Sequence, residues 1–193
     1  DIFSRAFWDN SVRNDLSEAF FESHRVQPNA KKASGFQQKD FALRNAAWAV
    51  SDTFSDRSAH AGNREGFQSW MENDASIANE KLTIDDIGKF SIELKQIAKL
   101  FGADLIGFVP IDERWHYSKK VNTIKFEPVS NKLPGNFSSV IVMGHAMDKS
   151  LVDTYPSALA SSAAGLEYSR EASIVTQMTT YIRSLGYEAL GSM

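Results

Sequence analysis

An amphipathic segment that runs directly into an apolar one, between residues 82 and 110, restricts the fold more than any other feature of the sequence. Its first part carries an apolar stripe at helical spacing, formed by Ile87, Phe90, Leu94, Ile97, Ala98 and Phe101. Thr83 and Asp86 resemble a capping box, and Gly102 suits the left-handed position that follows a helix. The sequence therefore predicts a helix over residues 84–101.

The segments that follow predict a layered sheet. The apolar run at 103–109, ended by Pro110, predicts a buried strand, and residues 139–145 predict a second one. The second run is apolar on both faces, as parallel strands tend to be. A further helix has an inner stripe formed by Ile174, Met178, Tyr181, Ile182 and Leu185, with Gly186 as its stop, and residues 187–190 predict a third strand. We expect the first two strands to pair in one sheet, with helix 84–101 packed on it.

This order of elements predicts an α/β fold, layered in the α+β manner, for residues 81–193. Residues 1–80 predict a helical and loop-like N-terminal segment. Within it, residues 41–54 have apolar positions at helical spacing, and residues 56–66 form a polar, glycine-containing loop.

Composition excludes several classes of function. The 193 residues include no cysteine, which removes disulfides, thiolate nucleophiles and cysteine-held metal sites from this chain. The net charge of −3 does not suggest a nucleic-acid partner. No phosphate-binding glycine motif is present, the four histidines lack metal-ligand spacing, and no apolar run reaches the roughly 18 residues of a membrane span.

Three segments in order resemble the corrinoid- and iron–sulfur-dependent reductive dehalogenases of the respiratory type. They are GADLIGFVPIDERWHYS at 102–118, KLPGNFSSVIVMGHAMD at 132–148 and SSAAGLEYSREASIVTQMTTYIRSLGYEAL at 161–190. The resemblance extends over most of residues 41–193. It implies part of a cobalamin-binding, nitroreductase-like domain in an enzyme that removes halogen from small organohalides.

The resemblance also implies what lies outside this sequence. The family carries two cysteine-rich motifs for two 4Fe–4S clusters beyond the third segment, so the chain is similar to the N-terminal portion of the enzyme. The DxHxxG pattern is absent, so the expected cobalamin is base-off with no protein histidine ligand. The family further implies export to the outer face of the cytoplasmic membrane, a small integral-membrane anchor protein and a possible homodimer.

The resemblance assigns Tyr168 as the proton donor. A phenol is neutral at pH 7 and can still donate its proton in an apolar pocket. We place Tyr168 at the leading end of its helix, with the alternative that it is a core ring. Arg170 is the nearest cation in the sequence, but residues two apart on a helix do not face each other.

Aromatic residues are the predicted substrate contacts. Trp48 and Phe54 fall where the respiratory enzymes have substrate-lining aromatics, although the family commonly has tyrosine at the second position. Plain core packing is the alternative for both. Phe3, Phe7 and Trp8 are weaker candidates for a further wall.

Trp115, Tyr117 and His145 are the predicted cofactor contacts. The DERWHYS run at 112–118 is otherwise an ion-paired turn after a strand, and His145 otherwise bonds backbone groups at a strand end. The small residues of 157–165 allow close approach of a macrocycle or, equally, of a second helix. As a whole, the chain is alternatively a non-catalytic corrinoid- or partner-binding fragment, or an epoxyqueuosine-reductase-like enzyme.

Overall fold

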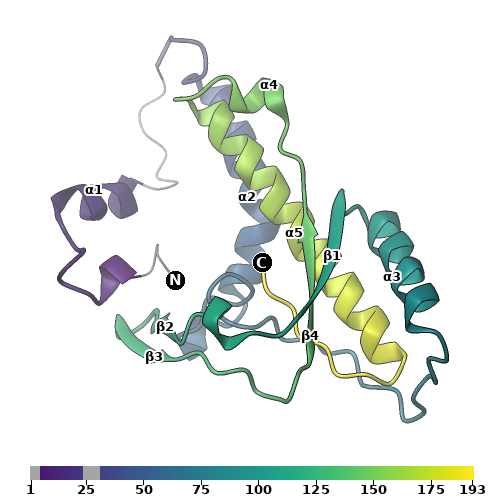
Figure 1. Ribbon diagram of the computed structural model, residues 1–193. Helices are drawn as coiled ribbons and strands as arrows, with labels where there is room; N and C mark the ends of the chain where they lie inside the picture. The colour runs from purple at the N-terminus through teal and green to yellow at the C-terminus, as the bar shows by residue number, and fades with distance from the viewer. Residues whose placement is uncertain (1–4, 24–30) are drawn as a thin grey trace.

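Two long helices, α2 (Gln38–Asp56) and α5 (Ala158–Ser184), run side by side in the same direction and form the frame of the molecule (Figure 1). The computed structural model describes residues 5–23 and 31–193. The two helices begin together, because the Ala158 backbone N–H donates to the Gly35 carbonyl oxygen at 3.0 Å. Small residues line their shared interface, so the backbones approach closely. The small-residue run at 157–165 therefore packs against a helix, the second of its two predicted roles.

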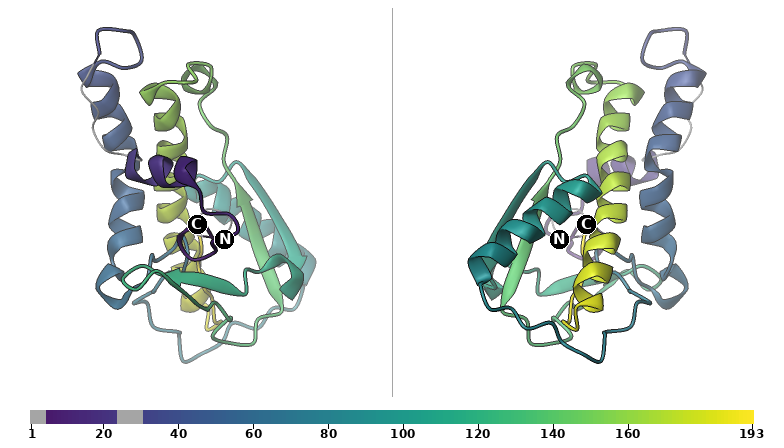
Figure 2. Two further views of the ribbon diagram at one scale, coloured as in Figure 1. Left: turned by 90° about the vertical axis from the view of Figure 1, so that its left-hand side faces the viewer. Right: turned by 90° about the vertical axis from the view of Figure 1, so that its right-hand side faces the viewer.

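The other helix of the predicted core, α3 (Ile87–Phe101), lies on the opposite side of α5 from α2 (Figures 1 and 2). Its N-cap is Asp86, whose side chain accepts from the Lys89 backbone N–H at 3.0 Å, so the helix begins three residues later than predicted. Gly102 ends it in the left-handed conformation, with φ of 115°, as the sequence predicts.

Strands β1 (Leu105–Pro110) and β4 (Ser139–Gly144) pair in one sheet, as predicted, but they are antiparallel. The expectation of parallel strands was wrong. The chain between them returns to the same end of the sheet through a hairpin, β2 (Lys119–Asn122) and β3 (Glu127–Ser130), and contains no crossover helix. The prediction that these apolar runs are buried was also wrong in part, because Leu105, Val109 and Val142 are 73%, 47% and 52% exposed.

The core lies where α3, α5 and the β1–β4 sheet meet. Ala98, Ala103, Ile174 and Met178 are its buried members, and Leu94, Ile97, Phe101, Ile106, Ile141, Met143 and Ile182 pack against them. The predicted packing of helix 84–101 on this sheet is therefore confirmed.

Residues 187–190 do not form the predicted third strand. They are irregular, and an isolated bridge joins the adjacent Gly191 to Met71. The preceding stop is as predicted, since Gly186 has φ of 85°. Two short helices, α1 (Asp15–Ser23) and α4 (Lys149–Val152), complete the described elements, with 3-10 turns at Arg5–Phe7, Ala59–Ala61 and Glu113–Trp115. The described residues thus form an α+β fold with two small antiparallel sheets. Within residues 5–23 and 31–193, no helix has both the length and the apolar character needed to cross a bilayer.

Candidate functional site

Tyr168 lies in the middle of α5 and not at the leading end of its helix. The helix begins at Ala158, ten residues earlier, because its first turns pack with alanine, serine and glycine rather than with large apolar residues. Those small residues give no visible apolar stripe, so the sequence placed the start of the helix too late. The Tyr168 side chain is half-buried and faces α2.

Trp48 of α2 stacks on the Tyr168 ring, with a centroid distance of 5.2 Å and an interplanar angle of 23°. Two features fix the indole. Its Nε1 donates to the Ser161 carbonyl oxygen at 3.0 Å, and its ring lies over Gly165, where an added Cβ would stand 2.5 Å from Trp48 Cδ1. Glycine at this position therefore sets how closely the two helices approach beside Tyr168.

Phe67 also contacts the Tyr168 ring, with a centroid distance of 5.3 Å and a tilt of 47°. Arg64 lies a few residues before Phe67 in the same loop. Its guanidinium carbon is 4.5 Å from the centroid of the Phe67 ring. Tyr168 thus contacts two aromatic rings from segments more than 100 residues away in the chain. This aromatic cluster, Trp48, Phe67 and Tyr168 with Arg64, is the candidate site.

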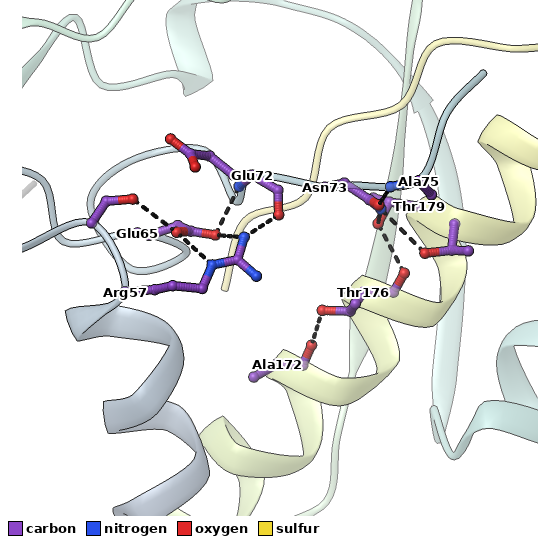
Figure 3. Close-up of polar contacts among 10 residues, drawn as sticks. Arg57, Glu65, Glu72, Asn73, Ala75, Ala172, Thr176 and Thr179 are labelled. Carbon is purple, nitrogen blue, oxygen red and sulfur yellow. Dashed lines mark hydrogen bonds and ion pairs between the residues drawn. The ribbon is translucent and has the colours of Figure 1, made fainter.

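A buried ion pair holds the loop that carries Arg64 and Phe67 (Figure 3). Glu65 is 1% exposed, and its Oε1 accepts from Arg57 Nη2 at 2.5 Å and from the Glu72 backbone N–H at 2.8 Å. Its Oε2 accepts from Arg57 Nε at 3.0 Å and from Ser58 Oγ at 3.1 Å. Arg57 also donates to the Glu72 carbonyl oxygen. Four hydrogen-bond donors therefore fix the carboxylate of Glu65, the residue that directly follows Arg64.

The next part of the loop is fixed to α5 directly. Asn73 Nδ2 donates to Thr179 Oγ1 at 2.7 Å, and Arg183 Nε donates to the Ala75 carbonyl oxygen at 2.6 Å (Figure 3 shows the first of these). The loop and the helix that carries Tyr168 therefore form one connected unit.

Charges around Tyr168 act in opposite directions on its pKa. Burial, first, and the negative charge of Glu171 raise the pKa of the phenol, whereas the guanidinium of Arg64 lowers it. Burial also raises the pKa of Glu171 and lowers the pKa of Arg64. Tyr168 is consequently protonated at neutral pH, and the positive charge of Arg64 favours its deprotonated form, the tyrosinate.

Arg170 is directed away from this cluster. Its Nη1 lies 3.1 Å from a Glu167 carboxylate oxygen and 3.8 Å from one of Asp104. The sequence correctly gave Arg170 little weight as the partner of Tyr168. It gave no sign of Arg64, which stands in a polar loop without periodicity.

The other predicted aromatic contacts lie in different surroundings. Phe54 is six residues after Trp48, about 240° further around α2, and its ring faces the Arg57 guanidinium at 5.8 Å. Phe7 and Trp8 contact the β2–β3 region, through Phe126 at 5.7 Å and Lys119 at 5.5 Å respectively. Phe3 lies outside the described residues.

Trp115 and Tyr117, the predicted cofactor contacts, are 82% and 57% exposed and line a cavity of about 280 Å³. Phe67 lines the same cavity, which connects this region to the aromatic cluster. Three buried polar atoms on its walls have no hydrogen-bond partner within the described chain: Gln68 Oε1, Trp70 Nε1 and Asn131 Oδ1. Lys120 also lines it and donates to Ser69 Oγ at 2.9 Å.

The DERWHYS run forms an ion-paired turn, the alternative to its predicted role in cofactor contact. Arg114 Nη2 donates to Asp112 Oδ2 at 2.6 Å, and this bond holds the pKa of the Asp112 carboxyl below its usual value. His145 differs from expectation, because both ring nitrogens are enclosed and neither has a hydrogen-bond partner in the part of the chain that the structure describes. Just after β4, the Ala146 backbone N–H donates to an Asp104 carboxylate oxygen at 2.8 Å.

A larger cavity, of about 930 Å³, lies between α3, the β1–β4 sheet and the last turns of α5. Its walls are mainly apolar side chains, such as Phe90, Phe108 and Ile182. Tyr168 does not line it, so this cavity and the aromatic cluster are separate.

Comparison with known proteins finds relatives of one kind. The chain is 31% identical over 130 residues to tetrachloroethene reductive dehalogenase of Desulfitobacterium hafniense, a match that covers 50% of this chain and 24% of the relative. The protein of the same name from Dehalobacter restrictus is 30% identical over 130 residues, with the same coverage. That from Sulfurospirillum multivorans is 26% identical over 124 residues, covering 51% of this chain and 25% of the relative.

The chain is a distant relative of the reductive dehalogenases. It spans about a quarter of the length of these relatives. No family model matches it. The relationship supports a dehalogenation-related, oxidoreductase function at the level of the family.

Proposed function

We propose that this chain forms the proton-donating side of the substrate pocket in a corrinoid-dependent reductive dehalogenase. The reaction replaces a carbon–halogen bond by a carbon–hydrogen bond, consumes two electrons and one proton, and releases halide. The observation that carries the proposal is the aromatic cluster, in which a protonated phenol contacts two rings and one of these rings also contacts a guanidinium.

Tyr168 has the properties that a proton donor to carbon requires. Its phenol is neutral at pH 7 because the ordinary pKa of tyrosine is about 10, and burial and Glu171 raise this pKa further. It can therefore stand in an apolar pocket without the cost of burying a charge. When the proton leaves, the charge of Arg64 opposes the energy of forming the tyrosinate. Trp48 and Phe67 limit the ring to one orientation, which keeps the donor in place.

The same cluster suits an apolar substrate. Organohalides are small and largely apolar, so a pocket for them needs aromatic walls and few polar groups. Trp48 and Phe67 supply such walls beside the donor. Phe54, on another side of α2, contributes to the pocket in this proposal only if the substrate extends toward the end of that helix.

The corrinoid supplies the low-potential electrons when it is bound. The cavity beneath Phe67 fits the edge of such a cofactor in its chemistry, because the unpartnered atoms of Gln68, Trp70 and Asn131 match the amides at a corrin periphery. Its 280 Å³ is below the roughly 300–1,000 Å³ of complete ligand pockets, so it takes an edge and not the ring. We propose that Trp115 and Tyr117 cover that edge, and we give His145 no role at the cobalt.

Two iron–sulfur clusters would deliver electrons to the corrinoid. The chain has no cysteine, so we propose that their thiolate ligands come from polypeptide outside these 193 residues. Export and a small membrane anchor remain predictions from the resemblance.

The test is Tyr168→Phe in the holoenzyme that contains this chain, assayed for dehalogenation with a reduced viologen as electron donor. The substitution keeps the ring and its stacking and removes only the O–H. Loss of a general acid typically lowers the rate about 10²–10⁴-fold, so turnover should collapse while cobalt content stays normal. Tyr181→Phe is the matched control, since Tyr181 lies on the same helix and its hydroxyl faces Glu93. Retention of more than about a third of the wild-type rate by Tyr168→Phe would show that another group donates the proton.

A further inference from the structure

Arg64 is a half-buried cation whose charge is not matched by a contacting anion. Among the residues that the structure describes, no carboxylate lies within 4.0 Å of its guanidinium, and its contact is the face of Phe67. Asp56 attracts it electrostatically from beyond that distance, and Asp56 is exposed. Burying a guanidinium without a partner is costly, so the loop is held in this position by other groups.

The groups that hold the Arg64 loop are hydrogen-bonded within the chain itself. The Arg64 carbonyl oxygen accepts from the Gln68 and Ser69 backbone N–H groups at 2.9 and 3.1 Å, and Glu65 is locked by its buried ion pair. The position of Arg64 beside Phe67 is therefore set by the loop backbone and does not depend on an ion pair of its own.

Tyr168 presents a second donor without an acceptor. Its O–H has no hydrogen-bond partner within the described residues, whereas the hydroxyls of Tyr181 and Tyr187 both have one. Phe67 contacts both groups, because the Arg64 guanidinium is 4.5 Å and the Tyr168 ring 5.3 Å from its centroid, so the two donors belong to one cluster.

We propose that Arg64 and the Tyr168 O–H form a binding site for a single halide ion, with Phe67 and Trp48 as its aromatic walls. A guanidinium is weakly hydrated and suits a large, weakly hydrated monovalent anion. Aromatic rings present positive edges, which also favour an anion at the rim of the cluster. Glu171 is the nearby group that opposes anion binding, and its burial favours the neutral form.

The choice of halide rests on the proposed function. Breaking the carbon–halogen bond with two electrons from the corrinoid releases the halogen as an anion, and the proton from Tyr168 goes to the same carbon. A halide site beside the proton donor therefore receives the leaving group where it is formed. The ion then departs to solvent, and no further oxidant or reductant is needed.

Chloride binding to the full chain, without corrinoid or substrate, tests the site. The ³⁵Cl line width reports bound chloride, and bromide and acetate are the competing anions. Wild-type protein should broaden the line, and bromide should remove the broadening at lower concentration than acetate does. Arg64→Gln should weaken binding about ten- to a hundredfold, as loss of a charge-assisted hydrogen bond implies, and Arg64→Lys should recover part of it. Arg170→Gln is the control, because Arg170 is already paired with Glu167, and it should bind as wild type does.

Wild-type binding by Arg64→Gln, or equal displacement by acetate and bromide, would overturn the site. If Arg64→Gln does not fold by near-UV circular dichroism, Tyr168→Phe decides instead, since it should weaken chloride binding severalfold and unchanged binding would reject the proposal. Because the assay requires no turnover, halide binding can fail while dehalogenation stands, and dehalogenation can fail while halide binding stands.

Discussion

Replacing Glu65 by alanine should destabilise the fold by about 2–4 kcal/mol. Removing one member of a fully buried ion pair typically costs about 3–5 kcal/mol, because the other charge is left unpaired. Here the carboxylate is 1% exposed but Arg57 is 37% exposed, so solvent recovers part of that cost. The Glu72 N–H and the Ser58 hydroxyl also lose their acceptor, at about 1–3 kcal/mol for each group that stays unsatisfied. Water entering the vacated space reduces this last part.

Urea unfolding of the full chain, followed by tryptophan fluorescence, measures the change. The midpoint should fall while the dependence on urea concentration stays the same, which identifies a change in stability. Glu127→Ala is the control, because its ion pair with Lys125 is long, at 3.7 Å, and exposed, and it should change stability by less than about 1 kcal/mol. The near-UV circular dichroism of the Trp48–Tyr168 stack should weaken only in Glu65→Ala.

An equal midpoint for the two variants would refute the reasoning. It would mean that the Glu65 network follows the loop conformation and does not determine it, and that the preorganisation of Arg64 has another source.

Three further outcomes are expected. Gly165→Ala should displace Trp48, since the added Cβ would stand 2.5 Å from the indole. The cost of overpacking, about 1–3 kcal/mol, should exceed the roughly 1 kcal/mol gained in helix propensity. Near-UV circular dichroism and urea unfolding measure the two effects. Glu171→Gln should lower the pKa of Tyr168 by removing a negative charge, which absorbance at 295 nm follows against a Tyr168→Phe background. Burial raises the folded-state pKa of Glu171. The contribution of Glu171 to stability is therefore lost as the pH rises from the ordinary glutamate pKa, about 4.3, through that raised pKa. Over this pH range the free energy of unfolding of Glu171→Gln should increase relative to that of the wild type.

The helices of the core could be predicted from the sequence because their signals are local. The stripe from Ile87 to Phe101 and the glycines that follow α3 and α5 each act within a few residues. The pairing of β1 with β4 also follows from two apolar runs that share one core. Their antiparallel direction depends on the path of the intervening chain, which periodicity does not report.

The candidate site was predicted only in part. Tyr168 and Trp48, which the resemblance selected separately, are in contact. Arg64 and Phe67 could not have been predicted, because a polar loop carries no pattern and their positions depend on one buried glutamate. The start of α5 was missed since small residues pack helices tightly without looking apolar. His145 was predicted to contact the cofactor or, alternatively, backbone groups at the strand end, but within the described residues the neighbouring Ala146 N–H donates to Asp104 instead.

The pairing of α2 with α5 has a consequence for biosynthesis. Trp48 bonds to Ser161, 113 residues later in the chain, and a ribosome adds residues at roughly 5–20 per second. On the order of 10 s therefore pass between the emergence of α2 and the emergence of its partner. During that interval the indole of Trp48 and the small residues around it are open to other nascent or misfolded chains, and a chaperone that shields α2 until α5 appears would raise the yield of folded protein.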